Sequence, residues 1–249
     1  MIAYDFAGRN AIVTGGTRGI GAAVTEALLR AGCRVTATCA GNMSAAKAFA
    51  ERLGALSEHL ETVAFDVGDY KACESFFADY DASHEPPDIL VHSAGIRQDG
   101  VVALMPVEQW RRVLEVNLDG AFNMSKLAVQ RMAGRRYGRI VLLTSPVGRM
   151  GFAGQANYAA SKAGLVAMAR SLAREVARRK ITVNCVSPGF IDTDFIAGLP
   201  DEQKQEYKAM VPMRRFGRPE EVARAVLFLA SEESEYLTGT VLEVSGGLG

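Results

Sequence analysis

Seven short apolar runs recur along the chain, and longer, mostly amphipathic stretches separate them. The runs occupy residues 9–15, 33–39, 59–67, 87–95, 138–145, 181–189 and 239–247. They are apolar along their length rather than alternating between apolar and polar residues, which is typical of strands buried on both faces. Strands that alternate with helices form parallel sheets with helices on each side. We therefore expect an α/β fold with a doubly wound, seven-stranded parallel sheet.

The stretches between the runs predict the helices. We expect helices at residues 20–32, 44–55, 69–81, 106–134, 155–179 and 219–231. Ser44 and Asp69 are expected to cap the second and third of them, because both are preferred N-cap residue types. No Pro/Ser-rich linker or repeat divides the chain, so we expect one domain over residues 1–249. The irregular stretch after the sixth run is well placed to form a substrate flap at about 188–218, since ligands bind beyond the carboxyl ends of such strands.

The charge of the 249-residue chain is balanced, with 28 basic and 28 acidic side chains. This balance gives no electrostatic reason to expect nucleic acid or an anionic membrane surface as a partner. The N-terminal residues do not resemble a signal peptide, and no apolar run approaches the ~20 residues of a membrane span. Cys33, Cys39, Cys73 and Cys185 form no C-x-x-C pair and have no histidine cluster nearby. We therefore expect a reduced, cytoplasmic protein that holds no metal.

The first apolar run continues into TGGTRGIG, residues 14–21, where the next predicted helix begins. A glycine-rich turn lets the backbone approach a pyrophosphate, and the N-terminal N–H groups and dipole of the following helix favour its negative charge. Glycine turns also serve simple chain reversal, but this one lies between a first strand and a first helix, as dinucleotide binding requires. The sequence therefore predicts a Rossmann-type domain that binds a dinucleotide cofactor.

The end of the second apolar run predicts which dinucleotide is bound. NAD sites usually place an acidic residue there, which hydrogen-bonds the 2′-hydroxyl of the ribose. Residues 35–50 contain no carboxylate, and Arg18 in the glycine loop can pair with a 2′-phosphate. We therefore expect NADP(H) as the cofactor. The alternative for Arg18 is a solvated loop arginine with no role in binding.

Tyr158 and Lys162 stand four residues apart in ANYAASKAGL, and Ser145 ends the fifth apolar run. Residues at this spacing share one helix face, about one turn apart. A tyrosine has a reference pKa of about 10, and the lysine ammonium is expected to stabilise the phenolate and lower this pKa. A hydroxyl at Ser145 can hold a carbonyl oxygen beside the tyrosine. Together the three groups can polarise a ketone while a hydride arrives and then protonate the alkoxide.

A tyrosine four residues before a lysine is common by chance and is often an ordinary helix pair, so the joint pattern decides. TGGTRGIG, DV at 66–67, SAG at 93–95, Asn117, Ser145, Tyr158-x-x-x-Lys162 and SPG at 187–189 follow one another at tight spacings. In this order the chain resembles the short-chain dehydrogenase/reductase family over essentially its whole length. GQANYAASKAGL, SLAREV and ITVNCVSPGFIDTDF are especially similar to the 3-oxoacyl-[acyl-carrier-protein] reductases of that family.

The resemblance implies a role for each candidate residue. Tyr158 is implied as the general acid, Ser145 as the hydroxyl that orients the substrate, and Lys162 as the ribose binder that adjusts the tyrosine pKa. Asn117 is implied to hold a water in a proton relay. Positions that match cofactor contacts are Gly15, Gly16, Thr17, Arg18, Gly19, Ile20, Gly21, Asp66, Val67, Ser93, Ala94, Gly95, Tyr158, Lys162, Pro188, Gly189, Ile191 and Thr193. Asp66 suits the adenine amino group, since Asp69 is better placed to cap the next helix.

Two arginines and two departures from the family pattern add to the comparison. Arg136 and Arg179 match positions with which these reductases dock their acidic carrier, although solvated arginines at helix ends are an equal alternative.

The family usually has an asparagine at the position of His92, where it braces the sheet. We expect His92 to be a hydrogen-bonded core histidine rather than a catalytic one. Pro146 restricts Ser145 towards an extended backbone, which could shift the substrate pocket.

The resemblance also implies a substrate. The leading hypothesis is NADPH-dependent reduction of a 3-oxoacyl thioester, carried by an acidic acyl carrier protein, in fatty-acid or polyketide-type biosynthesis. One alternative keeps the chemistry but acts on acetoacetyl-CoA or on a small ketone or alcohol. Another is a non-catalytic nucleotide-sensing protein, against which the retained serine, tyrosine and lysine argue, since a sensor needs no proton donor.

A homotetramer is the expected assembly, because the family pairs its long helices between subunits. The helices at 106–134 and 155–179 carry apolar residues beyond the needs of one face, namely Leu118, Phe122, Leu165 and Met168. The last strand, within residues 239–247, is implied to support a second interface.

Overall fold

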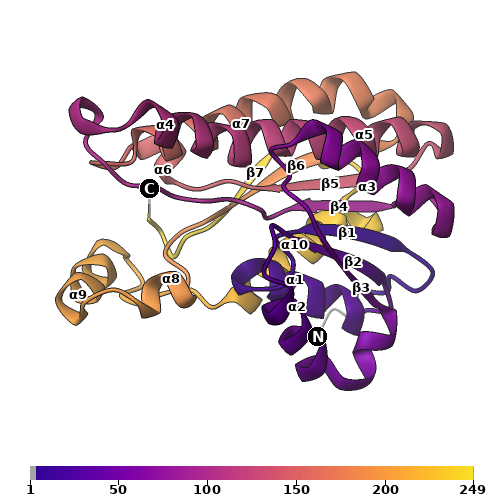
Figure 1. Ribbon diagram of the computed structural model, residues 1–249, viewed down its shortest axis with the longest axis horizontal. Coiled ribbons are helices and arrows are strands. Elements are labelled where there is room, and N and C mark those ends of the chain that lie inside the picture. Colours follow the sequence, from indigo (N-terminus) through magenta and orange to yellow (C-terminus); the bar gives the residue numbers. More distant parts are fainter. Residues whose placement is uncertain (1–3, 249) are drawn as a thin grey trace.

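A computed structural model describes residues 4–248, apart from the side chain of Phe195, and places seven parallel strands in one sheet (Figure 1). The strands are β1 (Asn10–Thr14), β2 (Arg34–Cys39), β3 (Leu60–Ala64), β4 (Ile89–His92), β5 (Gly138–Leu143), β6 (Ile181–Pro188) and β7 (Val241–Val244). Their order across the sheet is β3-β2-β1-β4-β5-β6-β7. The direction of winding therefore reverses between β1 and β4, where doubly wound sheets bind their ligands. The predicted fold class is confirmed.

Helices and short helical turns connect the strands. The α-helices are α1 (Gly19–Arg30), α2 (Met43–Leu53), α3 (Tyr70–Ser83), α4 (Val107–Leu114), α5 (Gly120–Arg135), α6 (Val147–Met150), α7 (Ala156–Val176), α8 (Asp194–Ala197), α9 (Asp201–Met210) and α10 (Pro219–Ala230). Four 3₁₀ turns, η1 (Gly54–His59), η2 (Val102–Leu104), η4 (Ala177–Arg179) and η5 (Glu232–Ser234), and the π-helical segment η3 (Glu115–Asp119) complete the described elements. Within residues 4–248, no helix combines the length and the apolar character needed to cross a membrane.

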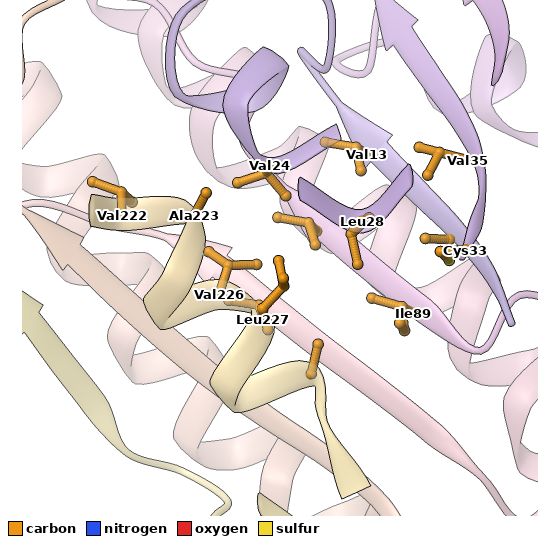
Figure 2. Close-up of a cluster of buried hydrophobic side chains, with 14 of the residues drawn as sticks. Val13, Val24, Leu28, Cys33, Val35, Ile89, Val222, Ala223, Val226 and Leu227 are labelled. Carbon is orange, nitrogen blue, oxygen red and sulfur yellow. The ribbon is translucent and has the colours of Figure 1, made fainter. Parts of the chain in front are cut away.

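Helices cover both faces of the sheet, and each face has its own core. On one face α1 and α10 pack together over the strands, and Figure 2 shows Val24 and Leu28 of α1 beside Val226 of α10 in this layer. On the other face α3, α5 and α7 supply a second core in which Phe77 and Leu165 are fully buried. Burial from both sides explains why the strands read as continuous apolar runs.

The starts of α2 and α3 test the two predicted helix caps. Asp69 caps α3 as expected, because its Oδ1 accepts the N–H groups of Lys71 (2.9 Å) and Ala72 (3.3 Å). The prediction for Ser44 is wrong. Asn42 caps α2, and its Oδ1 accepts the N–H of Ala45 (3.0 Å) and the hydroxyl of Ser44 (2.9 Å). Asparagine caps helices at least as well as serine, so the earlier of two suitable residues is used.

The stretch predicted as one helix over 106–134 has an irregular middle. The π-helical segment joins α4 to α5 without a break and holds Asn117. Such segments have hydrogen bonds five residues apart and are frequent at functional sites. The buried Asn117 side chain donates from Nδ2 to the Ile96 carbonyl (3.0 Å), and its Oδ1 accepts the Ile96 N–H (2.8 Å). The helix is thereby tied to the loop that follows β4.

Candidate active site

A cavity of about 970 Å³ lies at the carboxyl ends of the strands. Its walls come from the loops after β1 to β6, and α9 contributes Tyr207 and Met210. All residues predicted to contact the cofactor line this cavity except Gly16. Ser145 lines it as well, so one cavity brings together the glycine loop and the serine, tyrosine and lysine that the sequence indicated.

The glycine loop adopts a conformation that larger residues would obstruct. Gly15 has a φ of +61°, and a Cβ there would lie 3.0 Å from the Ala94 Cα. A Cβ on Gly21 would lie only 2.0 Å from the Gly15 carbonyl oxygen, so α1 can approach the loop only because this residue is glycine. Gly16 is buried, and a Cβ there would lie 2.7 Å from the Val13 carbonyl oxygen. Gly16 therefore packs the loop against β1 and does not line the cavity, so its predicted contact with the cofactor stays a prediction.

The first turn of α1 fits the pyrophosphate of a dinucleotide. Residues 19–21 line the cavity, and no side chain among the described residues caps this helix end. The first N–H groups of a helix lack partners within the helix and carry part of its dipole, so they favour an anion. A Cβ on Gly19 would lie 3.6 Å from Cγ2 of Thr193, which places the start of the predicted flap next to this turn.

The cavity wall beyond β2 contains no acidic residue among the described residues. It is formed by Thr38, Cys39, Ala40, Gly41, Asn42 and Ala45. Arg18 is exposed at the N-cap of α1 and lines the same cavity. Asp66 belongs to a different part of the wall, where its Oδ1 accepts the Gly68 N–H (2.9 Å) and its Oδ2 pairs with Arg112. The wall near β2 therefore suits a negatively charged 2′-phosphate, because no carboxylate among the described residues there would repel it.

Ser145 and Tyr158 meet at the end of the cavity away from β2. Ser145 follows β5, and Pro146 begins the short helix α6 directly after it. The Ser145 Oγ accepts the Val147 N–H at 3.3 Å, and the side chain also forms a hydrogen bond with Tyr158. A ketone oxygen placed between the two hydroxyl groups would accept a hydrogen bond from each of them.

The electrostatics of Tyr158 differ from the expectation. Burial raises the pKa of the Tyr158 phenol; the hydrogen bond to Ser145 and the charge of Arg97 lower it by less. Lys162 Nζ lies 5.5 Å from the Tyr158 ring centroid and donates to the Leu143 carbonyl at 2.8 Å. Burial also lowers the pKa of Lys162 to about 8. The predicted lowering by Lys162 is therefore not found in this structure, because its ammonium is directed to a backbone carbonyl.

Asn117 lies behind the cavity wall rather than in it. A Cβ on Gly95 would lie 3.4 Å from Asn117 Oδ1 and 3.5 Å from Lys162 Nζ, so the three residues are neighbours. Both N–H groups of the Asn117 amide are used, one by Ile96 and one by the Ser161 hydroxyl at 3.1 Å. The side chain braces the wall, and a relay water at this residue stays a prediction.

His92 is a buried, hydrogen-bonded core residue, as predicted. Its Nδ1 lies 3.0 Å from Oγ1 of Thr14, which also accepts the N–H groups of Ser93 (3.2 Å) and Ala94 (3.1 Å). Because that hydroxyl already accepts two hydrogen bonds, we assign its own proton to His92 Nδ1 and the ring proton to Nε2. Burial, assisted by the charge of Lys162, lowers the pKa of His92 to about 3, so the ring stays neutral.

Arg136 and Arg179 lie far from the cavity of their own chain. Arg136 follows α5 just before β5, and Arg179 lies in η4 just before β6. Both positions are at the amino ends of strands, whereas the cavity is at the carboxyl ends. The six residues of β5 alone span about 20 Å. In Figure 1, α8 and α9, which follow β6, lie at the left, and α5, which precedes β5, lies at the right.

Three residues that the sequence analysis passed over lie beside Tyr158. Arg97 lines the cavity two residues after the SAG motif, and its Nε lies 2.9 Å from Asp99 Oδ1. Gln155, at the N-cap of α7, donates to Asp99 Oδ2 at 3.2 Å. Their place in the sequence could have indicated Arg97 and Asp99, because residues directly after a motif at the carboxyl end of a strand lie at the ligand crevice.

A sequence model of the family described as enoyl-(acyl carrier protein) reductase matches residues 15–249. With the Rossmann fold and the cavity described above, this match and the relatives below show that the chain belongs to the short-chain dehydrogenase/reductase family. The match and the relatives show an oxidoreductase that acts on CH–OH or C=O groups, and the family implies a nicotinamide cofactor.

Individual relatives are similar over nearly the whole chain. The 3-oxoacyl-[acyl-carrier-protein] reductase FabG of Escherichia coli (strain K12) is 45% identical over 244 residues, which cover 98% of each chain. An acetoacetyl-CoA reductase of Rhizobium meliloti (strain 1021) is 42% identical and covers 96% of this chain and 98% of its own. A crystal structure of a protein from Agrobacterium tumefaciens, provisionally named a gluconate dehydrogenase, matches with a TM-score of 0.94. Its sequence is 33% identical, and the match covers 100% of this chain and 98% of that one.

Proposed function

We propose that the chain is an NADPH-dependent reductase that converts a 3-oxoacyl thioester, carried by an acyl carrier protein, into the 3-hydroxyacyl thioester. The observation that carries this proposal is the single cavity in which a glycine loop meets Ser145, Tyr158 and Lys162. The similarity to 3-oxoacyl-[acyl-carrier-protein] reductases at 45% identity supports the substrate class. The chain is proposed to work as one domain, with the flap at about 188–218. Within this segment the Ile191–Gly217 bridge joins the two ends of residues 192–216.

The residues of the cavity account for the chemistry. When bound, NADPH supplies a hydride, with its two electrons, to the C3 carbonyl carbon of the substrate. Ser145 and Tyr158 hold the C3 oxygen by hydrogen bonds, and Tyr158 gives its phenolic proton to this oxygen as negative charge develops there. The products are the 3-hydroxyacyl thioester, NADP⁺ and the tyrosinate form of Tyr158. A proton from solvent then converts the tyrosinate back to the phenol. The raised pKa of the Tyr158 phenol suits reduction, because the phenol stays protonated at neutral pH until negative charge appears on the C3 oxygen.

Arg18 is proposed to bind the 2′-phosphate of the cofactor. Replacing Arg18 with alanine should raise KM for NADPH about 10-fold or more and leave KM for NADH almost unchanged, because hydrogen bonds to charged groups contribute about 1.5–3 kcal/mol. Steady-state kinetics with both cofactors measures this. Arg30, at the far end of α1 and paired with Glu26, is the control arginine, and its alanine variant should affect neither cofactor. Equal efficiency of the unmodified enzyme with NADH and NADPH would contradict the assignment.

Assembly as a homotetramer is proposed from the apolar residues left exposed. Phe122 is 50% exposed on α5, Tyr236 is 99% exposed five residues before β7, and β7 is an edge strand of the sheet. Leu165 is removed from the predicted contact set, because it is fully buried within its own chain. Light scattering is expected to give about four times the chain mass of 26.7 kDa, with a dimer as the fallback. A stable, active monomer would exclude this proposal.

Carrier docking at Arg136 and Arg179 is proposed to involve a second subunit, since both precede strands about 20 Å or more in length whose far ends form the cavity of their own chain. Reversing both charges to glutamate should reduce kcat/KM on carrier-bound substrate at least ~10-fold, because the carrier is acidic and its docking is partly electrostatic. Activity on a short thioester mimic should not change, since it needs no docking surface. Added salt should weaken only the carrier reaction. Unchanged activity on both substrates would remove these arginines from docking.

The second candidate function is reduction of acetoacetyl-CoA, which the 42% identity to acetoacetyl-CoA reductases favours. Both candidates use the same residues, so the assay must vary the group that carries the acyl chain. NADPH oxidation is measured with one 3-oxoacyl group on carrier protein, on CoA and on the mimic. A clear preference for the carrier supports the main proposal, and a clear preference for CoA supports the second.

A further inference from the structure

A charged side chain outside the predicted catalytic set faces the reactive end of the cavity. Arg97 lies in the loop after β4, lines the cavity, and is 22% exposed in its side chain. Its guanidinium is near enough to the Tyr158 phenol for the positive charge to lower the pKa of that phenol. Burial and Asp99 raise this pKa, and Ser145 and Arg97 lower it, so Arg97 is a cation that favours loss of the Tyr158 proton.

Arg97 is held in position by contacts that tie its loop to the start of α7. Asp99 Oδ1 forms an ion pair with Arg97 Nε at 2.9 Å, and Asp99 Oδ2 accepts from Nε2 of the buried Gln155 at 3.2 Å. The fully buried Asn157 adds a third link, because its Nδ2 donates to the Gln98 carbonyl at 2.9 Å. Since Tyr158 follows Asn157 in the same helix, Arg97 and the proton donor are fixed relative to one another.

The charges of this subsite point to a neutral ligand atom. Asp99 already balances the positive charge of Arg97, so a free carboxylate gains little there. A guanidinium has five N–H donors and can serve a carboxylate and a second acceptor at the same time. The same cavity is also lined by the apolar or aromatic side chains of Met150, Phe152 and Tyr207. The cavity therefore combines a positioned donor group with apolar surface.

A 3-oxoacyl thioester matches this arrangement. Its thioester carbonyl is separated from the C3 carbonyl by one methylene group, so a second acceptor oxygen lies close to the reacting one. We propose that Arg97, positioned by Asp99 and Gln155, binds the thioester carbonyl oxygen while Ser145 and Tyr158 bind the C3 oxygen. The subsite thereby selects 1,3-dicarbonyl substrates over simple ketones. This inference rests on the proposed function and names the residue that recognises its substrate class.

Two variants and two matched substrates test the proposal. The first substrate is the N-acetylcysteamine thioester of 3-oxobutanoate; the second is the same molecule with the thioester carbonyl replaced by a methylene group. Arg97→Met should reduce kcat/KM for the first substrate roughly 10- to 100-fold, the usual effect of losing a hydrogen bond to a charged group. The second substrate should change less than about 3-fold, because it lacks the acceptor oxygen. Binding of the 3-hydroxybutanoyl thioester product, measured by calorimetry, should weaken in the same proportion as the first substrate.

Arg97→Lys separates recognition from a simple effect of charge. Lysine keeps the positive charge near Tyr158 but lacks the planar fork of a guanidinium. Arg97→Lys should therefore have the pH–rate profile of the unmodified enzyme and only part of its preference for the thioester. Arg131→Gln is the control, because Arg131 is 19% exposed, pairs with Asp81 and lies on α5 away from the cavity. It should leave both substrates unaffected.

The outcomes distinguish the inference from the proposed function. If the unmodified enzyme does not prefer the thioester over the matched ketone, the proposed function fails. If the unmodified enzyme prefers the thioester and Arg97→Met keeps the same preference, only the inference about Arg97 is overturned. Equal losses on both substrates would also overturn it, because they would assign Arg97 to the acidity of Tyr158 and not to substrate recognition.

Discussion

Tyr158→Phe is expected to reduce turnover at least ~100-fold while NADPH binding stays nearly unchanged. The substitution removes one hydroxyl group and keeps the ring, and general acid catalysis typically contributes about 10²- to 10⁴-fold to a rate. Ser145 remains to hold the C3 oxygen, but its hydroxyl is a far weaker acid than a phenol. Turnover is measured by NADPH oxidation, and binding by the fluorescence of the reduced cofactor.

Tyr80→Phe is the matched control for this variant. Tyr80 is buried on α3 and does not line the cavity, so loss of its hydroxyl tests the general effect of removing a buried phenol oxygen. Its kinetics should equal those of the unmodified enzyme. Near-normal turnover of Tyr158→Phe would show that another group is the proton donor.

Gly21→Ala is expected to abolish most cofactor binding and to lower the stability of the protein. The added Cβ would lie 2.0 Å from the Gly15 carbonyl oxygen, so the glycine loop and the start of α1 must move apart. Overpacking of this kind typically costs about 1–3 kcal/mol, and every loop contact to the pyrophosphate shifts with it. We expect NADPH affinity to fall roughly 10- to 100-fold, measured by fluorescence titration, together with a lower Tm.

Gly134→Ala is the corresponding control within a helix. A Cβ on this exposed residue of α5 meets no atom within 4 Å among the described residues, so no contact opposes the change. Alanine is favoured over glycine inside a helix by roughly 0.5–1 kcal/mol. Tm should rise slightly and NADPH affinity should stay the same. A Gly21→Ala variant that binds NADPH normally would contradict the close packing described for the loop.

The sheet was predictable because its physical cause is local. Each strand is covered on both faces, which demands a continuous apolar run, and a run of that kind is visible in the sequence without knowledge of its neighbours. The glycine loop was predictable for the same reason, since the backbone approach that requires Gly15 and Gly21 occurs between residues close together in the chain.

Features that depend on distant segments were not predictable in the same way. Arg97 is placed beside Tyr158 by contacts across more than fifty positions of sequence, including Gln155 to Asp99. Lys162 is directed to the Leu143 carbonyl by the fold of β5 against α7, so its effect on the Tyr158 pKa could not be inferred from helical spacing. Leu165 looked available for a subunit contact, but its burial depends on which way α7 faces.

The common direction of the strands gives the sheet two unlike rims. One rim holds the cavity with Ser145, Tyr158 and Lys162, and the other holds the turns that contain Arg136 and Arg179. The distance between the rims, about 20 Å, exceeds the 8–10 Å over which exposed charges act in physiological salt. Substitutions on the second rim are therefore expected to leave the acidity of Tyr158 unchanged. With carrier docking proposed at that rim, recognition and chemistry would be free to vary independently of each other.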